Sequence, residues 1–157
     1  MEFNNLVLRK RRDEMNELGV KIRWVGREQK LWSSVLNELL EAEELTKSNK
    51  VLTLNMCVNY GGRAEIVAAA EEMARDFKRG KVSKFDEKNF AKYLELPSDV
   101  DLFLRSSGEQ RLSNFLPWQS AYAELVFMDV LWPDADRRTL WKAIETYAAR
   151  NRRFGKA

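Results

Sequence analysis

The sequence contains no histidine among its 157 residues. This absence excludes Ser-His-Asp and Cys-His catalysis, zinc bound by histidine, and the HExxH metalloproteases. The only cysteine is Cys57, which excludes an internal disulfide or a cysteine-rich zinc site and suits a reducing cytoplasm. Any chemistry must therefore use carboxylates, arginines, hydroxyl groups or a hard metal ion.

Long apolar runs are lacking as well. No run approaches the roughly 20 residues that a membrane-spanning helix needs, and no charged and then apolar leader opens the chain. Hydrophobic residues make up 45% and charged residues 32% of the sequence, which is typical of a folded globular domain. We therefore expect a cytoplasmic domain without a membrane anchor.

Positive charge is concentrated at the C-terminal end. The chain carries a net charge of +3, yet from residue 137 onward seven basic residues face one acid, Glu145. A basic segment on a mildly acidic body indicates an anionic ligand or surface. Nucleic-acid binding would also use such a segment, but the pI of about 9.0 is marginal for that class and no recognised motif supports it. We expect no nucleic-acid partner.

The order of apolar patterns predicts an α/β fold: one domain spanning residues 1–157, with a mostly parallel central sheet of about four strands flanked by helices. The segment 51–58 is almost continuously apolar, which predicts a strand buried on both faces. Asp136 is a candidate N-cap for the last helix. The predicted strands are 20–26, 51–58, 100–104 and 123–127, and the predicted helices are 2–18, 31–46, 64–78, 89–94, 118–122 and 137–151.

Three polar features follow or adjoin these strands: the segments 59–63 and 105–113, and the acid Glu124. In open parallel sheets, ligands gather beyond the carboxyl ends of the strands. We therefore expect the three features to lie together at that edge.

The segment 105–113 has the chemistry of a diphosphate clamp. The guanidinium groups of Arg105 and Arg111 can each grip phosphate oxygens through two hydrogen bonds, and Ser113 can donate a hydroxyl. The alternative is a solvated loop in which these arginines pair with Glu109 and other surface acids.

Two other features have open interpretations. The paired glycines Gly61 and Gly62 at a strand-to-helix junction favour a packing role, although the start of the following helix could attract an anion. Glu124 interrupts an apolar segment, so its carboxylate needs a partner, which could be an arginine or Mg²⁺ shared with phosphate oxygens.

Taken in order, five motifs resemble the cis-prenyltransferases, the undecaprenyl and decaprenyl diphosphate synthases also called isoprenyl transferases. The match covers essentially the whole chain. The motifs are Asn59-Tyr-Gly-Gly-Arg63, Asp101-Leu-Phe-Leu-Arg105-Ser-Ser-Gly-Glu109-Gln-Arg111-Leu-Ser113-Asn-Phe115, Trp118-Gln-Ser-Ala-Tyr-Ala-Glu124-Leu, Leu131-Trp-Pro-Asp134 and Arg152-Arg-Phe-Gly155.

The resemblance implies condensation of isopentenyl diphosphate with an allylic diphosphate, repeated to build a polyprenyl diphosphate for the lipid carrier of cell-wall synthesis. Carried over by motif, Arg105, Arg111 and Ser113 would hold isopentenyl diphosphate. Glu124 would help to bind Mg²⁺, and Arg153 with Gly155 would reach the active site of the neighbouring subunit in a homodimer. Because the product is a lipid, the resemblance also implies a peripheral association with the inner face of the cell membrane.

The chain departs from the family at its start. Members open with a Met-Asp-Gly-Asn-Gly-Arg-Trp loop, whose Asp is the principal catalytic carboxylate, and carry a later Ser-x-Glu-Asn-Trp segment; neither occurs in this sequence. The sequence therefore resembles the C-terminal two thirds of a synthase, leaves no catalytic residue assigned, and predicts a truncated domain that is inactive alone. The alternative is a non-catalytic subunit that assists an active prenyltransferase chain.

Overall fold

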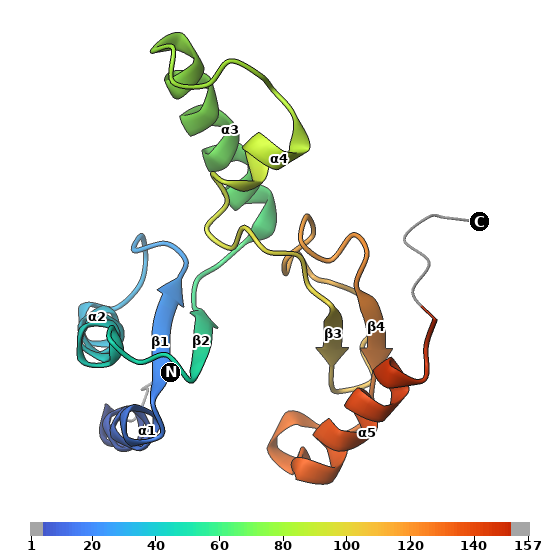
Figure 1. Ribbon diagram of the computed structural model, residues 1–157. Coiled ribbons are helices and arrows are strands. Elements are labelled where there is room, and N and C mark those ends of the chain that lie inside the picture. Colours follow the sequence, from blue (N-terminus) through green and yellow to red (C-terminus); the bar gives the residue numbers. More distant parts are fainter. Residues whose placement is uncertain (1–4, 152–157) are drawn as a thin grey trace. The chain divides into compact units, whose positions relative to one another are not determined.

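The computed structural model describes residues 5–151, and the chain divides after Tyr60 into two compact units. No helix in the described range is long and apolar enough to cross a membrane. The first unit contains α1 (Asn5–Glu17), β1 (Val20–Val25), α2 (Ser33–Thr46) and β2 (Leu52–Cys57), and the second contains α3 (Gly62–Lys78), α4 (Glu87–Ala91), β3 (Leu102–Arg105), β4 (Glu124–Phe127), the 3-10 helix η1 (Trp132–Asp134) and α5 (Arg137–Ala148) (Figure 1).

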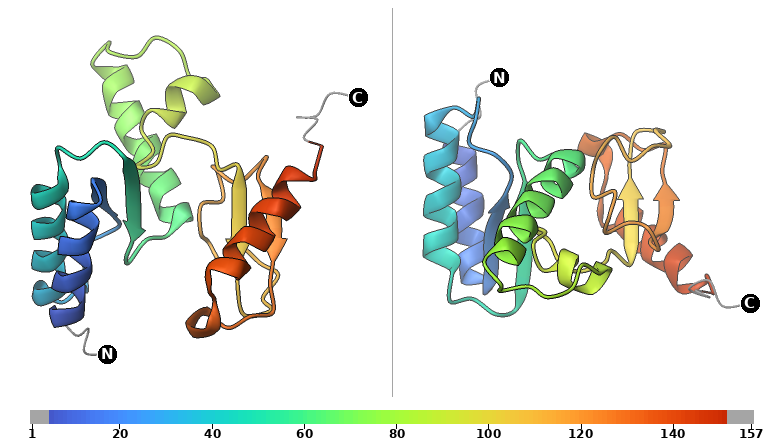
Figure 2. Two further views of the ribbon diagram at one scale, coloured as in Figure 1. Left: turned by 60° about the horizontal axis from the view of Figure 1, so that its bottom comes forward. Right: turned by 90° about the horizontal axis from the view of Figure 1, so that it is seen from above.

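In the first unit, β1 and β2 form a parallel pair with Val20 opposite Leu52 and Val25 opposite Cys57. The helices α1 and α2 run side by side next to this pair (Figure 2). At the start of β1, Val20 and Ile22 are buried and Lys21 and Arg23 are not, as expected for a strand with one face against a helix, and Val25 at its end is buried as well. The core of this unit consists of Val20, Ile22 and Val25 from β1 and Val35, Leu39 and Ala42 from α2.

Side chains of α2 take the place of a third strand along β1. The amide of Ile22 donates to Thr46 Oγ1 at 2.8 Å, and the amide of Trp24 donates to Glu43 Oε1 at 2.8 Å. Thr46 is completely buried and its hydroxyl also donates to Ala42 O at 2.7 Å. These bonds satisfy main-chain donors that an unpaired strand edge would leave exposed.

The strand β2 contradicts the expectation of burial on both faces. Its first four residues are exposed, with Leu52 60% and Leu54 39% accessible to solvent. The physical reason is that β2 pairs with β1 alone within the described residues, and both neighbouring helices contact β1. An apolar strand with this much exposed surface is typical of a surface that another segment covers.

In the second unit, β3 and β4 form another parallel pair, with Leu102 opposite Glu124 and Arg105 opposite Phe127. The helix α5 lies beside them (Figure 1), and its residue Ala143 is completely buried. The α/β class and the parallel pairing agree with the prediction. The predicted single sheet of four strands does not: the described strands form two separate pairs, β1-β2 and β3-β4.

A buried carboxylate ties three segments of the second unit together. Glu65, in the first turn of α3, is only 3% exposed and accepts hydrogen bonds from Leu96 N at 3.2 Å and Gln119 Nε2 at 3.1 Å. Gln119 is itself buried and also donates to Leu96 O at 2.9 Å. Residues 118–122, predicted as a helical turn, form hydrogen-bonded turns around this contact. The network holds the approach to β4 against the start of α3.

The last helix begins at the N-cap that the sequence predicted, Asp136, and the cap is a capping box. The side chain of Asp136 accepts from Thr139 N at 2.9 Å, and the amide of Asp136 donates to Thr139 Oγ1 at 3.3 Å. The hydrogen bond from the Thr139 amide lowers the pKa of the Asp136 carboxyl below its ordinary value. The charged carboxylate therefore stabilises the start of α5.

This cap predicts a pH-dependent stability that Asp136→Asn removes, because asparagine keeps an acceptor but does not titrate. Since the folded pKa lies below the unfolded value of 3.8, the extra stability of the wild type is complete above that pH and is lost as pH falls through the folded pKa. We expect the difference in Tm between wild type and Asp136→Asn to shrink on acidification. A difference that stays constant from about pH 6 to about pH 2 would contradict the assignment.

Candidate functional site

The two ends of the segment 105–113 are in contact with each other. Arg105 is the last residue of β3, and its Nη1 donates to Ser113 Oγ at 3.0 Å and to Arg111 O at 2.5 Å. The guanidinium and the hydroxyl that the sequence nominated therefore lie in contact at the carboxyl end of β3. A cationic fork beside a hydroxyl donor is an arrangement suited to phosphate oxygens.

The guanidinium of Arg111 has a different partner. It forms an ion pair with the carboxylate of Glu109, and its side chain is 63% exposed. The structure thus brings the main chain of Arg111 to Arg105, while the charged group of Arg111 adopts the pairing that the solvated-loop alternative predicted. Exposed pairs of this kind contribute little free energy, so a stronger anion can displace the carboxylate.

The backbone of this region is strained. Four residues other than glycine have positive φ angles, and Gly108 has a φ of 69°. Such conformations cost free energy and persist where surrounding contacts hold them, which is common at ligand sites. Two main-chain bonds fix the first bend, from Ser107 N to Val130 O at 2.8 Å and from Gly108 N to Met128 O at 2.9 Å. The four residues are Ser107 (69°), Ser113 (48°), Asn114 (66°) and Leu116 (49°).

Asn114 connects the end of this segment to the start of α3. Its main-chain oxygen accepts from Gly62 N at 2.9 Å, and its Oδ1 accepts from Arg63 N at 2.8 Å. These are the first amides of the helix, the groups that an anion would need. The structure therefore favours the packing role for the paired glycines over anion binding at this helix start.

Close packing explains Gly62 directly. A Cβ atom added there would lie 2.1 Å from Pro117 Cδ, and one added at Gly61 would lie 3.0 Å from Asn114 Nδ2. Both contacts involve the segment that follows Ser113. Asn59, at the beginning of the same motif, binds a different loop, because its Nδ2 donates to Arg27 O at 2.7 Å and to Gln29 O at 2.8 Å.

Glu124 does not lie where the sequence placed it. It is the first residue of β4 and pairs with Leu102, whereas Arg105 pairs with Phe127 at the other end of the two strands. Three residues of strand correspond to about 10 Å. The expected meeting of Glu124 with the 105–113 segment at one edge is therefore wrong within this chain. The physical reason is the register, because β4 starts at the acid instead of running past it.

The carboxylate of Glu124 is bound to an arginine. Its Oε2 accepts from Arg150 Nη1 at 2.9 Å, and the same nitrogen donates to Leu125 O at 2.9 Å. Its other oxygen has no hydrogen-bond partner among the described residues. No group of three potential metal ligands of the His, Cys, Asp and Glu types occurs in the described range. A metal ion at Glu124 would therefore take at most two ligands of these types from this part of the chain.

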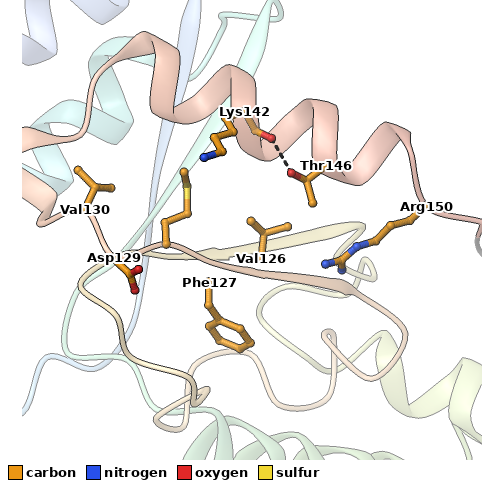
Figure 3. Close-up of a pocket in the computed structure, with 8 residues that line it drawn as sticks. Val126, Phe127, Asp129, Val130, Lys142, Thr146 and Arg150 are labelled. Atoms are coloured by element: carbon orange, nitrogen blue, oxygen red, sulfur yellow. Dashed lines mark hydrogen bonds between the residues drawn. The ribbon is translucent and has the colours of Figure 1, made fainter.

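A hollow of about 440 Å³ lies between β4 and α5 (Figure 3). Val126 points toward α5 and Phe127 points away from it, as alternation along a strand requires. Lys142 and Thr146 line the helix side, and Arg150 lies at one end. The basic groups here are exposed side chains, so the hollow is a weaker candidate for a site than the 105–113 segment.

Two nominated residues, Arg153 and Gly155, lie outside the described residues. Asn114 and Arg150 also contribute to these contacts, and the sequence analysis did not nominate them. Asn114 carried a signal, since it directly follows Ser113 within a nominated motif. Arg150 carried none beyond its place in the basic C-terminal segment, because its pairing with Glu124 spans 26 positions of sequence.

Comparison with known proteins identifies the family. The sequence model of the undecaprenyl diphosphate synthase family matches residues 1–155. The chain belongs to this family. It is 60% identical to a trans,polycis-polyprenyl diphosphate synthase, specific for (2Z,6E)-farnesyl diphosphate, from Thermobifida fusca, and 58% identical to a decaprenyl diphosphate synthase from Mycobacterium bovis.

These matches cover all of this chain but only part of the relatives. The alignments include 57% of the Thermobifida fusca protein and 54% of the Mycobacterium bovis protein, so the chain spans little more than half of their length. Among solved structures, lavandulyl diphosphate synthase from Lavandula x intermedia, in complex with dimethylallyl diphosphate, is similar to this chain with a TM-score of 0.89. That match has 32% identity and covers 97% of this chain and 68% of the other.

The packing at the start of α3 predicts that Gly62→Ala is strongly destabilising. The added methyl group overlaps the rigid ring of Pro117, so we expect the free energy of unfolding in urea to fall by about 3 kcal/mol, the upper end for overpacking. Gly80→Ala is the control, since its methyl group meets nothing within 4 Å and costs only about 1 kcal/mol for a left-handed backbone. Equal losses in the two variants would refute the packing role.

Proposed function

We propose that this chain carries the isopentenyl diphosphate-binding part of a cis-prenyltransferase, an enzyme that joins isopentenyl diphosphate to an allylic diphosphate and releases the allylic diphosphate group as pyrophosphate. The contact between Arg105 and Ser113 at the end of β3 carries the proposal. It places a cation and a hydroxyl donor next to each other on a backbone held in a costly conformation. Family membership supplies the substrate class.

The proposed work of these residues is electrostatic. Arg105 and Ser113 would hold the diphosphate of isopentenyl diphosphate, and Arg111 would exchange its bond to Glu109 for one to a phosphate oxygen. Fixing this group orients the double bond that attacks the allylic carbon. No residue of the described chain is assigned to remove the proton that leaves afterwards.

We also propose that the chain acts as a homodimer in which Glu124 serves the site of the other subunit. The register of β3 and β4 supports this, because Glu124 and Arg105 lie at opposite ends of the pair. Five exposed apolar side chains in the chain after β4 also support it, since apolar side chains gathered at a surface mark interfaces. They are Leu131 (58% exposed), Trp132 (74%), Leu140 (52%), Trp141 (56%) and Ile144 (37%).

Glu124 fits a role as one magnesium ligand. Its unpartnered oxygen can bind a cation while Arg150 keeps its second bond to Leu125 O, and Mg²⁺ commonly takes one or two protein carboxylates and completes its shell with water and substrate phosphate. When bound, Mg²⁺ would neutralise charge on the departing diphosphate. We propose that Arg153 and Gly155 reach the site of the other subunit, and the resemblance of the C-terminal motif supports this.

The proposal treats residues 1–157 as a single truncated domain. The exposed Leu52 and Leu54 on β2 support it, since a complete domain would cover such a strand. The same exposure favours the second candidate, a subunit that completes its fold on an active prenyltransferase chain. The paired Arg105 and Ser113 favour the first candidate, because a supporting subunit has no need of them. We place the protein in the cytoplasm, associating peripherally with the membrane that receives its lipid product.

Binding of inorganic pyrophosphate tests the anion site. Because a hydrogen bond to a charged group contributes about 1.5–3 kcal/mol, Arg105→Ala should weaken binding by about ten- to a hundredfold in calorimetry. Ser113→Ala should have a smaller effect. Arg79→Ala is the control, because Arg79 is an exposed arginine just after α3 whose ion pair is with Asp76, and this variant should bind as the wild type does. The proposal fails if Arg105→Ala and Arg79→Ala bind equally well.

Turnover tests the truncation. With (2Z,6E)-farnesyl diphosphate, isopentenyl diphosphate and Mg²⁺, we expect the isolated 157-residue chain to form no polyprenyl product, because it lacks the carboxylate-bearing loop that family members carry. The full-length Thermobifida fusca synthase, assayed alongside, shows that the conditions support the reaction. Steady product from the isolated chain would overturn the claim of inactivity and leave the anion site untouched.

A further inference from the structure

Asn114 lies next to the anion site and also caps the start of α3. It directly follows Ser113, the hydroxyl partner of Arg105, and its own backbone has a left-handed φ of 66°. Its Oδ1 and its main-chain oxygen accept from the first two amides of α3. A movement of Asn114 would therefore displace Ser113 and release the helix start together.

We propose that Asn114 is a positioning residue for the anion site, which fixes Ser113 in contact with Arg105 by anchoring the segment to α3. The inference rests on the proposed function of the Arg105 and Ser113 contact. Asn114 touches no substrate in this role. Ser113 and Asn114 both have left-handed backbones, with φ angles of 48° and 66°, which cost free energy. The hydrogen bonds of Asn114 to α3 hold these two residues in that conformation, and without them the segment would relax to an extended backbone.

The neighbouring contacts make the anchor rigid. Gly62 packs against Pro117, so α3 cannot shift toward the segment without a clash. Leu116, the next residue but one, is 8% exposed and adds a buried apolar attachment. Asn114 is thus held between the start of α3 and the buried Leu116. Ser113 is bonded directly to Asn114, so its position is fixed as well.

The coupling is reciprocal. If Asn114 transmits position between Ser113 and α3, an anion that binds Arg105 and Ser113 must also stabilise the hydrogen bonds at the start of α3. Pyrophosphate should then slow hydrogen exchange at the amides of Gly62 and Arg63, which donate to Asn114. A residue that served only to cap the helix would not produce this response.

Two substitutions separate the features of Asn114. Asn114→Gly keeps the left-handed backbone and the main-chain acceptor but removes Oδ1, while Asn114→Ala removes Oδ1 and also disfavours the backbone angle. Loss of a capping acceptor corresponds to about a fivefold effect, so we expect about fivefold weaker pyrophosphate binding for Asn114→Gly and a larger loss, about tenfold or more, for Asn114→Ala. Asn89→Ala, on α4, is the matched control, because it removes the bond that Asn89 Nδ2 donates to Lys84 O and the bond that Lys92 Nζ donates to Asn89 Oδ1.

The measurements are pyrophosphate affinity by calorimetry and amide exchange of the wild-type chain with and without pyrophosphate, at a temperature where every variant is folded. Weaker binding by both Asn114 variants, with Asn89→Ala unchanged and slowed exchange at Gly62 and Arg63, supports the role. If the wild type binds pyrophosphate and Asn114→Ala binds it equally well, or exchange at the two amides does not respond, the positioning role is overturned and the anion site stands. If the wild type does not bind pyrophosphate, the anion site itself fails.

Discussion

The hydrogen bonds of a single guanidinium hold the candidate site together. Arg105 Nη1 reaches both the hydroxyl of Ser113 and the main-chain oxygen of Arg111, and so closes a segment whose backbone angles are unfavourable for residues with side chains. The strain would unwind the segment without such contacts. Arginine suits this position because its planar group offers several donors in fixed directions, so one nitrogen can serve the protein while the others remain for a ligand.

The register of β3 and β4 is the second constraint. Parallel strands place residues in rows, and here one row holds Arg105 with Phe127 and another holds Leu102 with Glu124. Arg105 and Glu124 at opposite ends of the strand pair cannot serve the same small ligand, with the arginine on its diphosphate and the acid on a metal ion bound to it. Either Glu124 has only the structural partner Arg150, or it acts on a ligand held by another chain. The exposed apolar residues of η1 and α5 make the second possibility physically reasonable, because such a surface gains free energy when it is buried.

The local features of the sequence were predictable and the nonlocal ones were not. Asp136 was identified as a cap because aspartate is a preferred N-cap residue and directly precedes the last helix, and the structure shows a capping box there. Arg105 and Ser113 were nominated because they share one short segment. By contrast, the bond between Glu124 and Arg150 and the buried contact of Glu65 with Gln119 join residues 26 and 54 positions apart. Pairing register and such contacts depend on the whole fold, which no local pattern specifies.

The exposed strand β2 shows why the apolar pattern misled. A continuously apolar strand is typical of a strand buried on both faces. Leu52 and Leu54 fit that pattern, although both are exposed in this chain. The relatives are nearly twice as long, so on the proposed assignment their additional residues supply the missing cover. The contacts that make the anion site, by contrast, all lie between residues 62 and 130 of the second unit. On the proposed assignment, catalysis needs groups from outside this chain, whereas the anion site needs only residues of the second unit. A chain that leaves β2 uncovered would then lose catalysis before it loses the ability to hold a diphosphate.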